Sequence, residues 1–216
     1  MNKPNPQLEL ALLRARDLAC ARGGKKLFSD LSFELRSGQL LRISGSNGAG
    51  KSSLLRMLCG LLTPSAGTIE WNDAAIQVDR DGFHTQLIYL GHTPALKGDL
   101  SAEENMVAAG ILSGDSITSA MARAALTASD LGHLAGRLVR TFSQGQKQRV
   151  ALARLQLAKN KPLWLLDEPF NALDQAANES LQLLIRDHLA QGGMVALSSH
   201  QAVALDEMDQ LIRINL

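Results

Sequence analysis

The stretch that decides the fold is LLRISGSNGAGKSSLLRMLC, residues 40–59. Its first five residues are mostly apolar, which is typical of a strand near the centre of a sheet. A glycine-rich loop follows directly, and residues 51–59 then form an apolar run of helical character. Gly60 is suited to end that helix, because glycine readily adopts the left-handed conformation found just after many helices. The stretch therefore predicts a strand, a glycine-rich loop and a helix in immediate succession.

The loop matches the pattern G-x-x-x-x-G-K-[ST], which binds nucleotide phosphates. Its glycines let the backbone curl so that successive N–H groups point at phosphate oxygens, and the helix adds its positive N-terminal end. Lys51 would place its charge on the β- and γ-phosphates, and Ser52 would offer a hydroxyl to Mg²⁺. A glycine-rich turn without a ligand is the weaker interpretation, because a strand precedes the loop and a helix follows it. The predicted ATP-binding residues of this segment are Gly45, Ser46, Asn47, Gly48, Ala49, Gly50, Lys51, Ser52 and Ser53.

A second apolar strand, residues 163–166, ends in two carboxylates, Asp167 and Glu168. Asp167 is predicted to hold Mg²⁺ through water, since hard cations prefer oxygen ligands. Glu168 could polarise the water that attacks the γ-phosphate, a form of base catalysis worth roughly 10²–10⁴-fold. Carboxylates at a strand end are often only solvated, and the upstream phosphate loop is what favours the catalytic interpretation.

The segment FSQGQ, residues 142–146, precedes a predicted helix over residues 146–158. A helix N-terminus carries free N–H groups and the positive end of the helix dipole, so it is a natural anion site. By itself the segment is equally consistent with a plain helix N-cap. The candidate residues are Ser143, Gln144, Gly145 and Gln146.

The rest of the chain alternates between strand and helix patterns, which predicts an α/β fold with a largely parallel sheet and helices on both faces. Further strands are expected at residues 8–18, 31–36, 68–71, 87–90, 194–198 and 210–215, and a helix at 176–190. Residues 101–140 are rich in alanine, leucine and methionine and predict several short helices. Ser101 followed by Glu104 has the spacing of a capping box. The resulting domain prediction is one domain, residues 8–216, with a helical subdomain at about 95–141.

Composition excludes several classes of protein. The 216 residues carry a formal net charge of +1 and no long run of like charge, so nucleic acid is not an expected partner. No apolar stretch reaches the ~18 residues of a membrane span, and residues 1–7 lack the apolar core of a signal peptide. The two cysteines, Cys20 and Cys59, have no metal-ligand spacing and are expected to remain thiols, with Cys59 in the core.

Together these motifs resemble the ATPase subunits of ABC transporters. Residues 142–146 look like the family's signature motif, residues 171–174 (NALD) like its D-loop and residues 198–200 (SSH) like its switch-histidine strand end. The resemblance implies a P-loop NTPase core with a largely parallel sheet, an antiparallel β edge and an inserted helical subdomain. It also implies that two copies pair head to tail around two ATP molecules. Asp174 would then link the two sites, and His200 would contact the γ-phosphate.

Three positions depart from the usual pattern of that family. Arg22 stands near the position of the aromatic residue that stacks on adenine, and a guanidinium can also stack on a base. A solvated surface arginine is an equally good interpretation. His92 stands in the place of the Q-loop glutamine, where a neutral imidazole can accept a hydrogen bond from a metal-bound water. Gln144 replaces a signature glycine, so the approach of the backbone to phosphate must tolerate a side chain there.

These departures resemble one branch, the heme-exporter ATPase subunits of cytochrome c maturation. That branch shares the stretch CARG at residues 20–23, the run YLGH at 89–92 and LWLLDEPF at 163–170. The resemblance implies an integral membrane permease subunit of the cytochrome c maturation system as partner. It places the chain on the cytoplasmic face of the bacterial inner membrane, attached through that partner. The implied work is heme export or release of a heme-loaded chaperone, and the chain itself has no Cys-x-x-Cys-His heme motif.

Two alternatives stay open on the sequence alone. The cargo could be a lipid, a peptide or a drug, because the membrane subunit selects it. The chain could instead be a soluble ABC protein acting on ribosomes or DNA. Translation-type members resemble two fused domains, whereas this chain carries one, and residues 101–140 are too short for the long coiled coils of chromosome-type members.

Overall fold

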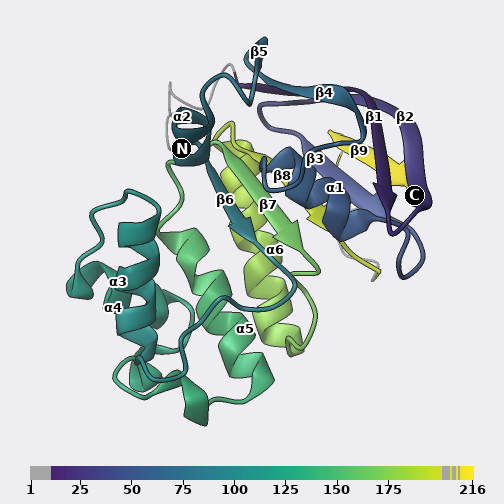
Figure 1. The fold of residues 1–216 in the computed structure, drawn as a ribbon. Helices are drawn as coiled ribbons and strands as arrows, with labels where there is room; N and C mark the ends of the chain where they lie inside the picture. The colour runs from purple at the N-terminus through teal and green to yellow at the C-terminus, as the bar shows by residue number, and fades with distance from the viewer. Residues whose placement is uncertain (1–10, 201–204, 206–207, 209) are drawn as a thin grey trace.

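The computed structural model describes residues 11–200, 205, 208 and 210–216. Two separate sheets organise these residues, one of five strands and one of four. Figure 1 shows the four-stranded sheet on one side of the five-stranded sheet and the helices α3 and α4 on the other. β9 and Leu216, the residue that follows it, lie beside the strand that leads into the glycine-rich loop.

The five-stranded sheet is parallel and has the order β6-β7-β8-β3-β9. All of its strands were expected from apolar runs, and the observed bounds differ from the expected ones by one residue at most. β7 and β8 are buried along their whole length, as strands covered on both faces should be. The bounds are β3 Leu40–Ser44, β6 Leu87–Leu90, β7 Leu163–Asp167, β8 Met194–Ser198 and β9 Leu211–Asn215.

The four-stranded sheet is antiparallel, with the order β2-β1-β4-β5. It forms a sheet of its own and does not extend the edge of the parallel sheet. β1 ends later than expected and β2 begins earlier than expected, because Gly23 and Gly24 both have positive φ and turn β1 directly back into β2. The first three residues of the strand expected at 8–18 lie outside the described part of the chain. The bounds are β1 Leu12–Arg22, β2 Lys25–Arg36, β4 Ala66–Trp71 and β5 Ala74–Ala75.

Two hydrophobic clusters hold the core layers together, one on each face of the parallel sheet. On one face, α1 (Lys51–Leu58) packs between that sheet and buried residues of the antiparallel sheet. On the other face, α6 (Gln175–Ala190) and the end of α5 (Gln144–Ala153) with η3 (Arg154–Gln156) cover Trp164 and Leu166. The parallel sheet is therefore buried on both faces, as the alternating pattern predicted.

A third cluster lies within the helical segment. α3 (Ala102–Leu112) begins with the expected capping box, in which Ser101 and Glu104 exchange hydrogen bonds of 3.2 and 2.7 Å. α4 (Ser119–Ala128), η1 (Gly132–Leu134) and η2 (Val139–Thr141) follow, and buried residues of these elements share the cluster with Val150 and Ala153 of α5. The short α2 (Arg80–Thr85) before β6 was not expected, although Asp79 caps it.

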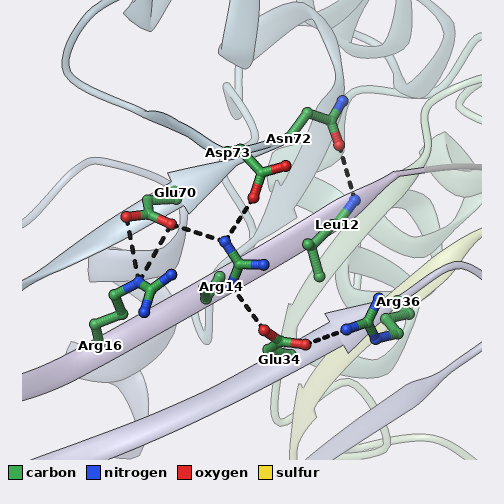
Figure 2. A network of polar contacts seen from close by, with 8 residues as sticks. All are labelled: Leu12, Arg14, Arg16, Glu34, Arg36, Glu70, Asn72 and Asp73. Atoms are coloured by element: carbon green, nitrogen blue, oxygen red, sulfur yellow. Dashed lines mark hydrogen bonds and ion pairs between the residues drawn. The ribbon is translucent and has the colours of Figure 1, made fainter.

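A network of charged side chains covers the outer face of the antiparallel sheet (Figure 2). Arg14 lies at its centre, with its Nε 2.7 Å from Glu34 Oε1 and its Nη1 3.1 Å from Glu70 Oε2 and 2.6 Å from Asp73 Oδ1. Arg16 pairs with Glu70, and Arg36 pairs with Glu34. The hydrogen bonds that Arg14 donates to these carboxylates raise the pKa of Arg14, and they in turn lower the pKa of Glu34. The network ties β1 to both of its neighbouring strands.

Candidate functional site

The glycine-rich loop lies between the end of β3 and the start of α1, as predicted. Gly50 occupies the N-cap position with φ +114°, and no side chain caps the helix. Gly48 has φ +81°, and a side chain at Gly50 would press against the ring of Phe28 at 3.1 Å. The first N–H groups of α1 therefore remain available to an anionic ligand, in a loop whose backbone only glycine adopts easily.

Lys51 is the buried cation of this loop, with a relative exposure of 7%. Its ammonium donates hydrogen bonds to the carbonyl oxygens of Gly45 at 2.9 Å and of Ser46 at 3.1 Å. Two backbone carbonyls therefore hold the positive charge over the loop. No carboxylate in the described part of the chain pairs with it, so its charge stays available to phosphate oxygens.

The two acidic residues at the end of β7 both bond to one hydroxyl from the neighbouring strand β8, Asp167 through its carboxylate and Glu168 through its backbone N–H. Ser198 Oγ donates to Asp167 Oδ1 at 2.8 Å and accepts a hydrogen bond of 2.9 Å from the backbone N–H of Glu168. Asp167 is 2% exposed, and its second oxygen, Oδ2, makes no hydrogen bond within the described residues. Glu168 has φ +52°, an uncommon conformation for a side chain of this kind. Ser198 thereby holds the carboxylate of Asp167 and the main chain of Glu168, while Asp167 Oδ2 remains without a hydrogen bond within the described residues.

Glu168 also meets the predicted switch histidine. His200 Nε2 lies 3.2 Å from Glu168 Oε1, and the His200 side chain is 44% exposed whereas Glu168 is nearly buried. The imidazole therefore stands between the carboxylate and solvent. Both residues line a cavity of about 540 Å³. Its lining comprises Arg22, Leu27, Asn47, Gly48, Gly50, Lys51, Ser52, Ser53, His92, Glu168 and His200.

This cavity brings together predicted residues that are far apart in the sequence. Arg22, at the tip of the β1–β2 hairpin, and His92, which follows β6, both face it. Both side chains are exposed, which leaves them free to reach a ligand. Their predicted contacts, Arg22 with the base and His92 with a metal-bound water, remain proposals that this placement allows.

The signature segment lies elsewhere. Ser143 caps α5 through a capping box, accepting from Gln146 N–H at 3.2 Å while Gln146 Oε1 accepts from Ser143 N–H at 2.9 Å. Ser143 and Gln144 are exposed, and none of residues 143–146 lines the cavity described above. The side chain of Gln144 therefore has room at its position.

The D-loop-like segment, residues 171–174, packs against the signature segment, residues 142–146. A side chain at Gly145 would lie 2.9 Å from the carbonyl oxygen of Ala172, which itself has φ +60°. Gln148 Nε2 donates to the carbonyl of Pro169 at 3.3 Å. Asp174 is the N-cap of α6 and accepts a hydrogen bond from Ala177 N–H at 2.8 Å. Asp174 thus has a local structural role within this chain, and its predicted role between two sites remains a proposal.

Ser198 is the residue that the sequence analysis did not single out as functional. It was noted only as part of the run SSH, yet it is fully buried and bonded to the carboxylate of Asp167 and to the backbone N–H of Glu168. The available signal was a hydroxyl at the end of a strand predicted to lie in the same parallel sheet. Cys59 is buried in the core, as expected, and burial raises its pKa to about 11; Cys20 is buried as well, and both cysteines are free thiols.

Asp167 and Ser52 are suited to bind a magnesium ion that retains most of its coordinated water molecules. Asp167 Oδ2 is a buried anionic oxygen with no hydrogen-bond donor within the described residues, and Ser52 faces the cavity at the first turn of α1. Among the described side chains there is no cluster of three or more His, Cys, Asp or Glu suited to a metal. Mg²⁺ typically binds through one or two protein oxygens together with substrate phosphates and water, so oxygens such as Asp167 Oδ2 and the Ser52 hydroxyl suit it.

The fold and this cavity define a nucleotide-binding domain. Comparison with known proteins identifies its family. The sequence model of the family described as ABC transporter matches residues 28–171, so the chain belongs to the ABC transporter family. Among curated proteins, it is 47% identical to the cytochrome c biogenesis ATP-binding export protein CcmA of Aromatoleum aromaticum, over 88% of this chain and 89% of that one. It is 46% identical to the CcmA protein of Dechloromonas aromatica (89% and 94% covered) and 42% identical to that of Pseudomonas aeruginosa (90% and 95% covered).

Solved structures agree with this placement. A structure described as the ATP binding subunit of an ABC transporter superposes with a TM-score of 0.82 at 27% identity, covering 94% of this chain and 85% of that one. A putative ABC transporter ATP-binding protein from Pyrococcus furiosus gives 0.80 at 25% identity, covering 95% and 97%. In the described part of the chain, no helix combines the length and apolar character that a membrane crossing needs.

Proposed function

We propose that this chain binds ATP with Mg²⁺ in the cavity between the glycine-rich loop and Glu168, and hydrolyses it. The observation that carries the proposal is that one cavity gathers Lys51, Ser52, Glu168 and His200. When bound, Mg²⁺ would neutralise part of the phosphate charge, held by Ser52 and, through water, by Asp167. The N–H groups at the start of α1 and the ammonium of Lys51 bind and orient the phosphates.

In this proposal Glu168 accepts a proton from the attacking water, and His200 contacts the γ-phosphate. The position of Glu168 is well defined, because Ser198 holds its N–H and His200 lies 3.2 Å from its carboxylate. Near burial removes competing solvent from around the carboxylate. The remaining work is positioning and electrostatic stabilisation, which dominate phosphoryl transfer.

The active unit in this proposal is a head-to-tail pair of two copies. Ser143 and Gly145 stand at a capped helix N-terminus outside the cavity of their own chain. A second copy would present them to the γ-phosphate held by Lys51 of the first, with Gln144 and Gln146 flanking the contact. Asp174, at the start of α6, would lie near the junction of the two sites.

The complex proposed for this pair is an ABC transporter of c-type cytochrome biogenesis. The support is the similarity to relatives named as cytochrome c biogenesis ATP-binding export proteins, which extends over 86–94% of the chain. The chain would attach to an integral membrane permease on the cytoplasmic face of the bacterial inner membrane. ATP hydrolysis would be coupled to heme export or to release of a heme-loaded chaperone, with His92 near the point of coupling.

The first test concerns hydrolysis. Glu168→Gln should retain ATP binding and lose hydrolysis by about 10²–10⁴-fold, because the amide cannot accept the proton. ATP binding is followed by equilibrium titration and turnover by phosphate release. Equal turnover in the variant and the wild type would exclude Glu168 as the base.

The second test concerns the complex. The native assembly is purified from membranes of the source cell through a tag on this chain, and its companions are identified by mass spectrometry. A cytochrome c maturation permease among them is the expected result. A permease for another cargo would overturn the heme assignment and leave the ATPase proposal intact, and recovery only with ribosomes or DNA would overturn both.

A further inference from the structure

The strand β9 carries none of the motifs described above, yet it lies directly beside the strand that enters the phosphate loop. β9 is the edge strand of the parallel sheet and pairs with β3 in register, from Leu40 with Leu211 to Ser44 with Asn215. Because the two strands end together, the residue after Asn215 stands next to the first residue of the loop. This neighbour relation makes β9 a candidate support for the loop.

Three contacts connect the end of β9 to Ser44, the last residue before the loop. The N–H of Leu216 donates to the Ser44 carbonyl oxygen at 3.0 Å. The Ser44 hydroxyl lies 3.1 Å from the Ile214 carbonyl oxygen and 3.3 Å from Asn215 Oδ1, and it donates to these acceptors. Leu216 also packs its side chain against the main core cluster, which anchors this end of the strand.

The next residue, Gly45, is confined by the same strand end. It has φ +141°, and a side chain there would lie 2.6 Å from the carbonyl oxygen of Leu216. The Gly45 carbonyl oxygen accepts one of the two hydrogen bonds from Lys51, at 2.9 Å. A displacement of Leu216 would therefore move a group that holds the ammonium over the loop.

We propose that Asn215 and Leu216 are positioning residues for the nucleotide: they fix the entry of the phosphate loop and so set its affinity for the phosphates of ATP. This proposal rests on the proposed binding of ATP in the cavity. Neither residue touches the ligand in this account. The effect passes through Ser44 and Gly45 to the carbonyl that holds Lys51, so it should alter binding more than the chemical step.

The test replaces Leu216 in two ways in the full-length protein. Leu216→Pro removes the N–H that bonds to Ser44, whereas the matched control Leu216→Ala keeps this N–H and removes only the side chain. The Kd for Mg-ATP, KM, kcat and the melting temperature are measured for each variant. Loss of one main-chain hydrogen bond corresponds to about a two- to ten-fold change in an equilibrium constant. The expected result is that Leu216→Pro raises Kd and KM by about five-fold with kcat within two-fold, while Leu216→Ala lowers only the melting temperature.

A second pair of variants covers the case in which Leu216→Pro fails to fold. Ser44→Ala removes the hydroxyl that bonds to β9 and should raise Kd by about two- to three-fold. Ser32→Ala is its matched control, because the Ser32 hydroxyl accepts a backbone N–H at 2.8 Å in the antiparallel sheet and does not line the cavity at the loop. The proposal is overturned if Ser44→Ala and Ser32→Ala have the same Kd, or if Leu216→Ala and a folded Leu216→Pro do. Absence of ATP binding by the wild type would instead refute the proposed function itself.

Discussion

The charged network around Arg14 and the carboxylates at the end of β7 contain similar groups, but they differ in how completely those groups are bonded. In the network of Figure 2, Arg14 pairs with three carboxylates, and two further arginines pair with Glu34 and Glu70. At the end of β7, Asp167 Oδ2 is buried with no hydrogen bond among the described residues. A polar cluster whose members satisfy one another holds strands together. A buried carboxylate oxygen without a hydrogen bond is costly to the fold, and under the proposed function Asp167 Oδ2 is the oxygen that would hold metal-bound water.

The largest effect is expected from removing the charge of Asp167, which tests whether this carboxylate serves a metal ion. Asp167→Asn keeps the shape and the oxygen that accepts from Ser198, but it removes the charge that would hold metal-bound water. The expected result is a loss of about 10- to 100-fold in magnesium affinity or turnover, the usual cost of changing an outer ligand. The measurement is a Mg²⁺ titration of ATP hydrolysis, with urea unfolding in parallel. Unchanged Mg²⁺ dependence together with a large loss of stability would assign Asp167 a purely structural role.

Ser198→Ala tests how much the site depends on the hydroxyl that holds it, because this change leaves Asp167 and Glu168 in place and removes their shared partner. The backbone N–H of Glu168 and Asp167 Oδ1 would each lose a hydrogen bond in a buried environment. An unsatisfied buried group costs about 1–3 kcal/mol, so the free energy of unfolding should fall by about that amount. Turnover should fall as well, because Glu168 loses its fixed position.

Ser199→Ala is a suitable control for Ser198→Ala, since it makes the same chemical change one residue further along. Turnover that falls equally in both variants would show that the loss is not specific to the bonds made by Ser198. Unfolding is followed by circular dichroism in urea, and turnover by phosphate release.

The site contains features that a sequence pattern predicts and features that depend on how distant strands pair. The phosphate loop and the two carboxylates are local patterns, so their chemistry follows from neighbouring residues. The bond from Ser198 depends on β7 and β8 lying side by side with Asp167 opposite Ser198, a register that no local pattern contains. The same limit applies to Arg14, whose three partners come from β2, β4 and the turn after β4. The hairpin that carries Arg22 to the cavity could have been predicted, because Gly23 and Gly24 are a typical two-residue turn.

His188 shows that an unpartnered buried atom does not by itself mark a ligand site. Its ring stacks on Trp164 with centroids 3.8 Å apart, and its Nε2 makes no hydrogen bond within the described residues. Burial lowers the pKa of His188 from 6.5 to about 4. Between these two values the unfolded chain binds a proton that the folded chain does not, so stability is complete above pH 6.5 and falls as the pH is lowered towards 4.

The shifted pKa of His188 predicts that the free energy of unfolding falls by about 2 kcal/mol between pH 6.5 and pH 5. His188→Phe keeps an aromatic ring against Trp164 and removes the titration, so it should lessen the decline of stability over that interval by a similar amount. Urea unfolding at pH 7.5, 6.5 and 5 measures the difference between the two proteins. Parallel curves for the variant and the wild type would contradict the prediction.

The smallest effect is expected from a change in the charged network around Arg14. Arg14→Met keeps most of the apolar length of the side chain and removes its three ion pairs, leaving Glu34 and Glu70 to their outer partners, Arg36 and Arg16. Exposed ion pairs contribute little individually, so the melting temperature should fall by only a few degrees and the difference should shrink in high salt. The KM for ATP should not change, because none of these side chains lines the nucleotide cavity. A rise in KM without a change in melting temperature would mean that the antiparallel sheet communicates with the phosphate loop, and the distinction between a cluster that holds strands and a cluster that holds a ligand would then fail.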